Sequence, residues 1–126
     1  MNAALALLTD TATTADLERI QAALTAWLVD EEGPSLQQYL GINRAAARRE
    51  LRNQRLRRAA AYLDATGKTD LAEQLAESAR AFTVRRWPRW RISGPPPEAT
   101  RLDLELFAAR QFGPIDLGAR QLLNIL

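Results

Sequence analysis

An arginine-rich stretch that begins at a glycine turn constrains the fold of this chain most strongly. Gly41-Ile42-Asn43 is a short turn sequence, and seven of the sixteen arginines then fall between Arg44 and Arg58. Because an α-helix rotates about 100° per residue, four of them share an arc of roughly 80°. These four are Arg44, Arg48, Arg52 and Arg55. Such a stripe gathers like charges on one side of a helix, so it faces solvent or a polyanion, of which nucleic acid is the commonest.

Helical periodicity extends through the rest of the chain. Apolar residues recur at helical spacing, the breaks carry glycine, proline or capping residues, and no segment alternates as a strand does. The apolar opening, 1–8, is expected to form a small helix or arm. The other predicted helices are 14–29, 36–40, 43–65, 69–86, 98–112 and 115–126. The pattern therefore predicts an all-α fold, a small bundle of about five to six helices.

Proline and glycine mark one clear linker. Ser93-Gly94-Pro95-Pro96-Pro97 favours an extended polyproline conformation. We therefore expect a helical domain over 1–92, the linker at 93–97, and a C-terminal helical segment over 98–126 that packs on the same domain.

The segment from Leu36 to Leu51 resembles the C-terminal helix-turn-helix of the Fis and nitrogen-regulator family, in which a Gly-Ile-Asn-Arg turn precedes a basic recognition helix. Here the same turn is Gly41-Ile42-Asn43-Arg44. The residues suit that role, since Gly41 supplies backbone freedom for a tight turn and Asn43 is a good N-cap. Two departures are Ala47, where the family has a larger apolar residue, and Glu50, where it has a cation. The resemblance implies a helix-turn-helix embedded at 35–65.

By that resemblance, Arg44 and Arg48 would read base edges, while Asn43 and Arg49 would contact the phosphate backbone. Arg52 and Arg55 continue the basic stripe and complete the candidate nucleic-acid-binding set. Leu17, Ile20, Leu24 and Trp27 form an apolar face on the first long helix. We expect that face either to enter the core or to pair two copies as a homodimer. The alternative interpretation of the basic segment is a solvated helix packed by its alanines.

A second basic segment alternates arginine with tryptophan. Its candidate contact residues are Arg85, Arg86, Trp87, Arg89 and Trp90. Held partly extended by Pro88, they would stack on bases and pair with phosphates, and the composition also suits an anionic membrane surface. The favoured interpretation is structural: the two tryptophans pack into the core beside Phe82 while the arginines stay solvated.

Composition narrows the classes of function. The chain has no cysteine and no histidine, which removes the common nucleophile–base pairs and most transition-metal sites. No glycine-rich phosphate loop is present, and the carboxylates follow no catalytic pattern. We therefore expect no enzyme activity, no metal site and no cofactor. The N-terminus lacks a basic signal-peptide region and no segment is long enough to span a membrane, so we expect a cytoplasmic protein.

These observations favour a DNA-binding protein of bacterial or phage type, a transcriptional regulator or an architectural factor, that docks its arginine-rich helix in the major groove. A protein-binding adaptor or inhibitor from a mobile element is the alternative, because arginine and tryptophan are enriched at binding hot spots. RNA binding through the same residues is a third interpretation.

Overall fold

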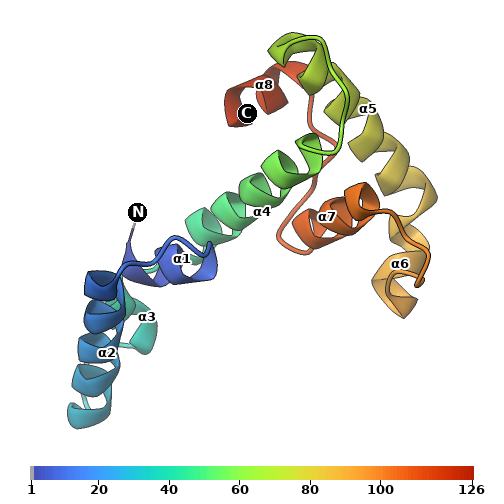
Figure 1. Cartoon of the computed structure of the whole chain (residues 1–126). Helices are drawn as coiled ribbons and strands as arrows, with labels where there is room; N and C mark the ends of the chain where they lie inside the picture. The colour runs from blue at the N-terminus through green and yellow to red at the C-terminus, as the bar shows by residue number, and fades with distance from the viewer. Residues whose placement is uncertain (1) are drawn as a thin grey trace. The chain divides into compact units, whose positions relative to one another are not determined.

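The computed structural model describes residues 2–126 and shows eight α-helices in that range, with no strand among the described residues (Figure 1). The helices are α1 (Ala3–Leu8), α2 (Thr14–Val29), α3 (Leu36–Leu40), α4 (Arg44–Ala60), α5 (Lys68–Arg85), α6 (Trp87–Ser93), α7 (Arg101–Arg110) and α8 (Ala119–Ile125). The predicted all-α fold is confirmed. Met1, the first residue of the predicted opening segment, lies outside the described residues.

The chain forms two compact units, residues 1–48 and 49–126. Their boundary falls within α4, and residues 98–126 lie in the same unit as α5. The reason is that α7 and α8, which follow the prolines, both pack against α5. Residues 93–97 therefore connect helices of a single core.

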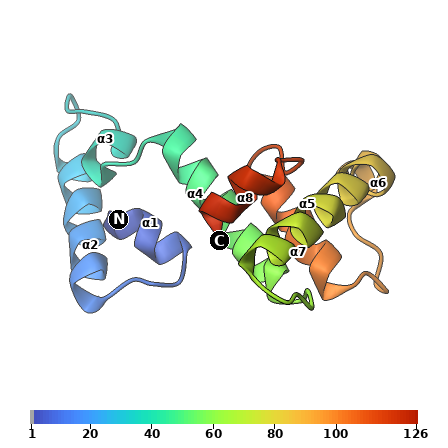
Figure 2. The same ribbon diagram turned by 90° about the horizontal axis from the view of Figure 1, so that it is seen from above.

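The first unit contains α1, α2, α3 and the start of α4, and capping residues set its helix boundaries. Thr13 caps α2 and Ser35 caps α3; each forms a capping box with the side chain three residues later. These caps place α2 and α3 at the predicted boundaries. The helix α2 contacts α1 and α3 on one side (Figure 2), yet none of its residues is fully buried. The buried residues of this unit are Ala4, Ala6 and Thr9, all from α1 or its C-terminal end.

The second unit has a continuous apolar core. Its largest fully buried side chains are Leu56, Leu75, Phe82, Leu106, Ile115 and Leu122. They come from α4, α5, α7, α8 and the segment between α7 and α8, so every helix of this unit except α6 contributes at least one. Trp90 from α6 closes the core with an edge-to-face contact on Phe82, at 5.5 Å between ring centroids.

Three predicted boundaries are wrong. The helix α4 ends at Ala60 rather than about 65, because a turn follows in which Tyr62 and Leu63 donate to the carbonyls of Ala59 and Ala60. The helix α7 begins at Arg101 rather than 98, because Thr100 caps it through the Asp103 amide. The last helix begins at Ala119 rather than 115. Ile115, where the helix was predicted to begin, is fully buried in a non-helical segment. Its packing in the core, and not helix formation, determines its position.

Candidate nucleic-acid interface

The turn between α3 and α4 has the hydrogen bonds of a Schellman C-cap. Gly41 adopts a left-handed conformation, with φ 66°. The amide of Gly41 donates to the Gln38 carbonyl and that of Ile42 to the Gln37 carbonyl, both at 3.1 Å. A side chain at position 41 would be strained by this backbone, which explains why glycine suits the position.

Asn43 then starts α4 as the sequence predicts. Its side-chain Oδ1 accepts from the Ala46 amide at 3.0 Å, and its carbonyl accepts from the Ala47 amide at 2.9 Å. Asn43 itself is exposed. Arg44 and Arg48, one turn apart at the N-terminal end of α4, are both exposed. Ala47 is half-buried and lines a small hollow against α1.

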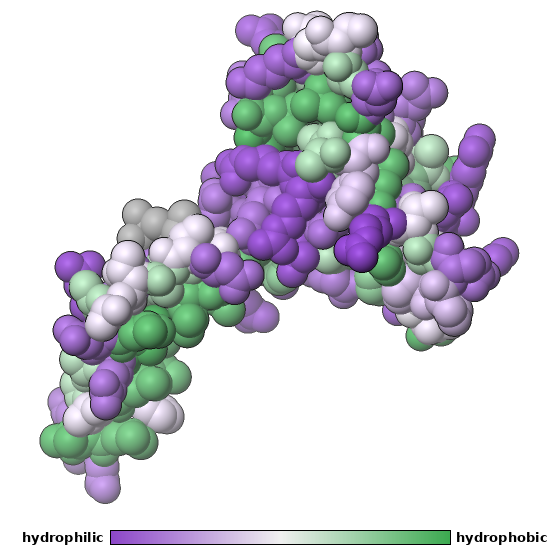
Figure 3. Space-filling model, viewed as in Figure 1, coloured by the Kyte–Doolittle hydropathy of each residue, from purple (hydrophilic) through white to green (hydrophobic). Residues whose placement is uncertain are grey.

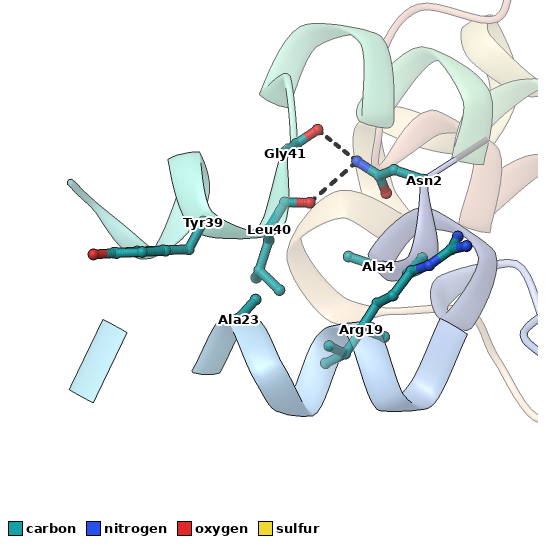
Figure 4. Close-up of a pocket in the computed structure, with 9 residues that line it drawn as sticks. Asn2, Ala4, Arg19, Ala23, Tyr39, Leu40 and Gly41 are labelled. Carbon is teal, nitrogen blue, oxygen red and sulfur yellow. Dashed lines mark hydrogen bonds between the residues drawn. The ribbon is translucent and has the colours of Figure 1, made fainter. Parts of the chain in front are cut away.

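Asn2 fixes the turn from the N-terminal side. Its amide nitrogen donates to the carbonyls of Leu40 and Gly41 (Figure 4). Its Oδ1 accepts from the Leu5 amide and so caps α1. One side chain therefore ties the start of α1 to the end of α3. Sequence reasoning missed this residue: asparagine before an apolar helix is a recognisable N-cap, but its second partner lies 39 positions away.

The remaining arginines of the predicted stripe belong to the second unit and differ from Arg44 and Arg48. Arg52 donates to the Pro114 carbonyl at 3.3 Å, and Arg55 pairs with Glu105 at 3.3 Å. Partial burial and the nearby charge of Arg49 lower the pKa of Arg52, although a guanidinium stays protonated at neutral pH. Arg49 itself is exposed. Of the six predicted residues, Asn43 caps α4, whereas Arg52 and Arg55 contact segments of the second unit that follow the prolines.

The arginine–tryptophan segment is helical, so the expectation of a partly extended chain is wrong. Pro88 lies in the first turn of α6, where its missing N–H costs nothing. Trp90 is buried beside Phe82, and Trp87 packs on Phe107 with the Arg110 guanidinium 4.5 Å from its ring centroid. The structural interpretation is confirmed for Trp90, which is buried beside Phe82. Trp87 is half-buried and packs on Phe107 rather than Phe82.

The arginines of that segment also differ in their contacts. Arg86 pairs with Asp103 at 3.0 Å, whereas Arg85 and Arg89 are exposed. Val84, near the end of α5, and Ile92, in α6, are 72% and 81% exposed. These exposed apolar residues were missed, because the sequence analysis weighed only the arginines and tryptophans.

Within residues 2–126, no helix is long and apolar enough to cross a membrane, and no cluster of acidic side chains could hold a metal ion. Comparisons of the chain with protein-family models, with curated proteins and with solved structures gave no match.

Proposed function

We propose that the first unit binds duplex DNA, with α3 and the Gly41–Asn43 turn positioning the N-terminal end of α4 in the major groove. The observation that carries the proposal is the placement of Arg44 and Arg48. Both are exposed on the first turns of a helix whose start is held by the Schellman turn, the Asn43 cap and the Asn2 side chain. Helices that read the major groove present their N-terminal residues to the base edges.

Electrostatics support the same end of α4. The N-terminus of a helix carries a partial positive charge, and exposed backbone amides there attract anions. Arg44 and Arg48 add two full charges within the first five residues of the helix. In this proposal Arg44 and Arg48 donate to guanine edges, and the side-chain amide of Asn43 donates to a phosphate.

The proposal is tested by fluorescence anisotropy with a preferred duplex selected from a random pool. Arg44→Ala and Arg48→Ala are each expected to weaken binding by about 1–3 kcal/mol and to flatten the preference among sequences. Arg80→Ala is the matched control, since Arg80 is an exposed arginine in α5 of the other unit. Equal effects from all three substitutions would leave only non-specific attraction and would contradict the proposed role.

A second candidate function follows from a separate surface. Val84 and Ile92 expose apolar side chains within the same stretch of sequence as the exposed Arg85 and Arg89, and a protein partner covers such a mixture better than a phosphate backbone does. The function would then be that of an adaptor or inhibitor that binds a host or phage protein. The double variant Val84→Glu/Ile92→Glu would release a stoichiometric partner on gel filtration after nuclease treatment, whereas Arg44→Ala would not.

A further inference from the structure

The outer face of α2 is apolar and uncovered in the described structure. Leu17, Leu24 and Leu28 are 49%, 38% and 71% exposed, and with Gln21 they share an arc of roughly 60° on the helix. Ile20 and Ala23, by contrast, are half-buried and line the pocket against α1 and α3 (Figure 4). Apolar surface gathers over the part of the molecule where α2 and α3 lie (Figure 3). The exposed stripe is therefore additional to the face that builds the unit.

The spacing of this stripe is the same in both directions. Its positions, 17, 21, 24 and 28, are separated by four, three and four residues. A second copy related by a two-fold axis would therefore place Leu17 against the partner's Leu28, and Gln21 against the partner's Leu24. The four positions carry no charge, so two copies can meet without desolvating an ion. A self-complementary patch of this kind is what a two-fold interface requires.

Charge decides the direction of the pairing. Asp30, Glu31 and Glu32 follow α2 directly, and all three are exposed. In a parallel pair these three acids would face three identical acids. In an antiparallel pair they lie beside the N-terminal turn of the partner's α2, where the helix dipole is positive. Asp16 in that turn is directed to its own Thr13 and Arg19. Glu18 also lies near that turn, but the antiparallel arrangement is the one that keeps the two segments of three acids apart.

We propose that a second copy of this chain covers the α2 stripe, and that the two α2 helices pair antiparallel about a two-fold axis between residues 22 and 23. The biological role that we give to this pairing rests on the proposed DNA-binding function. A two-fold axis would present two copies of the Arg44–Arg48 surface to a duplex, as dimeric readers of palindromic sites do. The pairing itself requires no DNA.

Disulfide cross-linking tests the direction, because the chain has no native cysteine. Copies carrying Leu17→Cys and copies carrying Leu28→Cys are mixed and oxidised without DNA. The antiparallel pair predicts a disulfide-linked dimer that joins the two variants. Leu17→Cys alone is expected to give none, since the two positions 17 would lie about 16 Å apart along the helix axis. Cross-linking of Leu17→Cys with itself, or no cross-link from the mixture, would overturn the proposal.

A matched pair of substitutions tests the stripe. Leu24→Lys and Leu104→Lys change leucines of nearly equal exposure, 38% and 40%, in α2 and α7 respectively. Sedimentation equilibrium is expected to show at least about a tenfold weaker dimer for Leu24→Lys, because each dimer loses two apolar contacts. Leu104→Lys should match wild type, with circular dichroism confirming that both variants fold.

A wild-type chain that stays monomeric at about 100 µM, a concentration at which even weak specific dimers form, contradicts the pairing. If Arg44→Ala abolishes DNA binding but the cross-link still forms, the proposed α2 pairing still holds.

Discussion

Arg55 and Glu105 form an ion pair at 3.3 Å that joins α4 to α7 inside the second unit. Arg55 lies on the arginine stripe that suggested nucleic-acid binding, and its partner lies 50 residues away in the sequence. An arginine chosen for contact with a polyanion and one chosen for an internal ion pair look the same in a sequence. The ion pair makes Arg55 part of the fold, whereas our proposal uses Arg44 and Arg48 for the interface.

This assignment predicts opposite behaviour for two substitutions on the same helix. Arg55→Met should lower the free energy of unfolding by about 0.5–1 kcal/mol, the value of a partly exposed ion pair, and leave DNA affinity nearly unchanged. Arg44→Ala should leave stability unchanged and weaken DNA binding. Urea denaturation together with anisotropy measures both quantities. If Arg55→Met lowered DNA affinity as much as Arg44→Ala does, Arg55 would belong to the DNA interface and the prediction would be wrong.

Gly41→Ala should destabilise the first unit by about 1–2 kcal/mol, because alanine is strained in a left-handed conformation. The nearest atom to an added Cβ is Asn2 Nδ2 at 3.8 Å, so the cost is conformational and not steric. Gly67→Ala is the control: that residue has φ 179° and no atom within 4 Å of an added Cβ. Thermal unfolding should show a loss for Gly41→Ala and no loss for Gly67→Ala. Equal stabilities would show that the turn tolerates another conformation.

Phe82→Ala should cost about 3–5 kcal/mol, as large-to-small substitutions in a packed core do. Phe82 is fully buried, and its ring meets Trp90 edge to face. The same variant should raise the wavelength of tryptophan emission, because Trp90 loses the neighbour that keeps it from water. If denaturant unfolding of Phe82→Ala matched wild type, the packing of Phe82 against Trp90 would not contribute to the core.

Stability should fall at acid pH partly through Asp70. The Thr66 backbone N–H, and then the Gln74 side chain, donate to its carboxylate and hold the pKa of Asp70 below its ordinary value. A carboxyl with a lowered folded pKa stabilises above its unfolded pKa of about 4, and that contribution is lost as the pH falls through the folded pKa. Asp70→Asn should therefore lower stability at pH 7 and make it less dependent on pH below 4. Urea titrations at pH 7, 4 and 2.5 measure this, and parallel pH curves for the two proteins would contradict it.

Local chemistry explains what the sequence predicted well. Thr13 and Ser35 are capping residues with a partner three positions later, and Gly41 and Asn43 are required by a tight turn, so α2, α3 and the start of α4 were predictable. The burial of Trp90 followed from its size. These features depend on neighbours within a few residues, which a single sequence displays.

Long-range contacts explain what it did not predict. Ile115 leaves a helical pattern because the core of the second unit holds it, and Asn2 binds a carbonyl 39 positions away. Arg52 and Arg55 find partners in segments that follow the prolines. No local pattern encodes such pairings. For the same reason, helical periodicity alone could not show that Arg52 and Arg55 contact distant segments of the fold.

The most direct test of the proposed function is the affinity of nuclease-treated wild-type protein for a randomised duplex pool at two salt concentrations. The DNA-binding proposal predicts a dissociation constant below about 10 µM at low salt, and weaker binding at higher salt as phosphate contacts release counterions. It also predicts that selection from the pool enriches guanine at positions that Arg44→Ala no longer prefers. Failure of the wild-type protein to bind any duplex below about 10 µM at low salt would contradict the proposal.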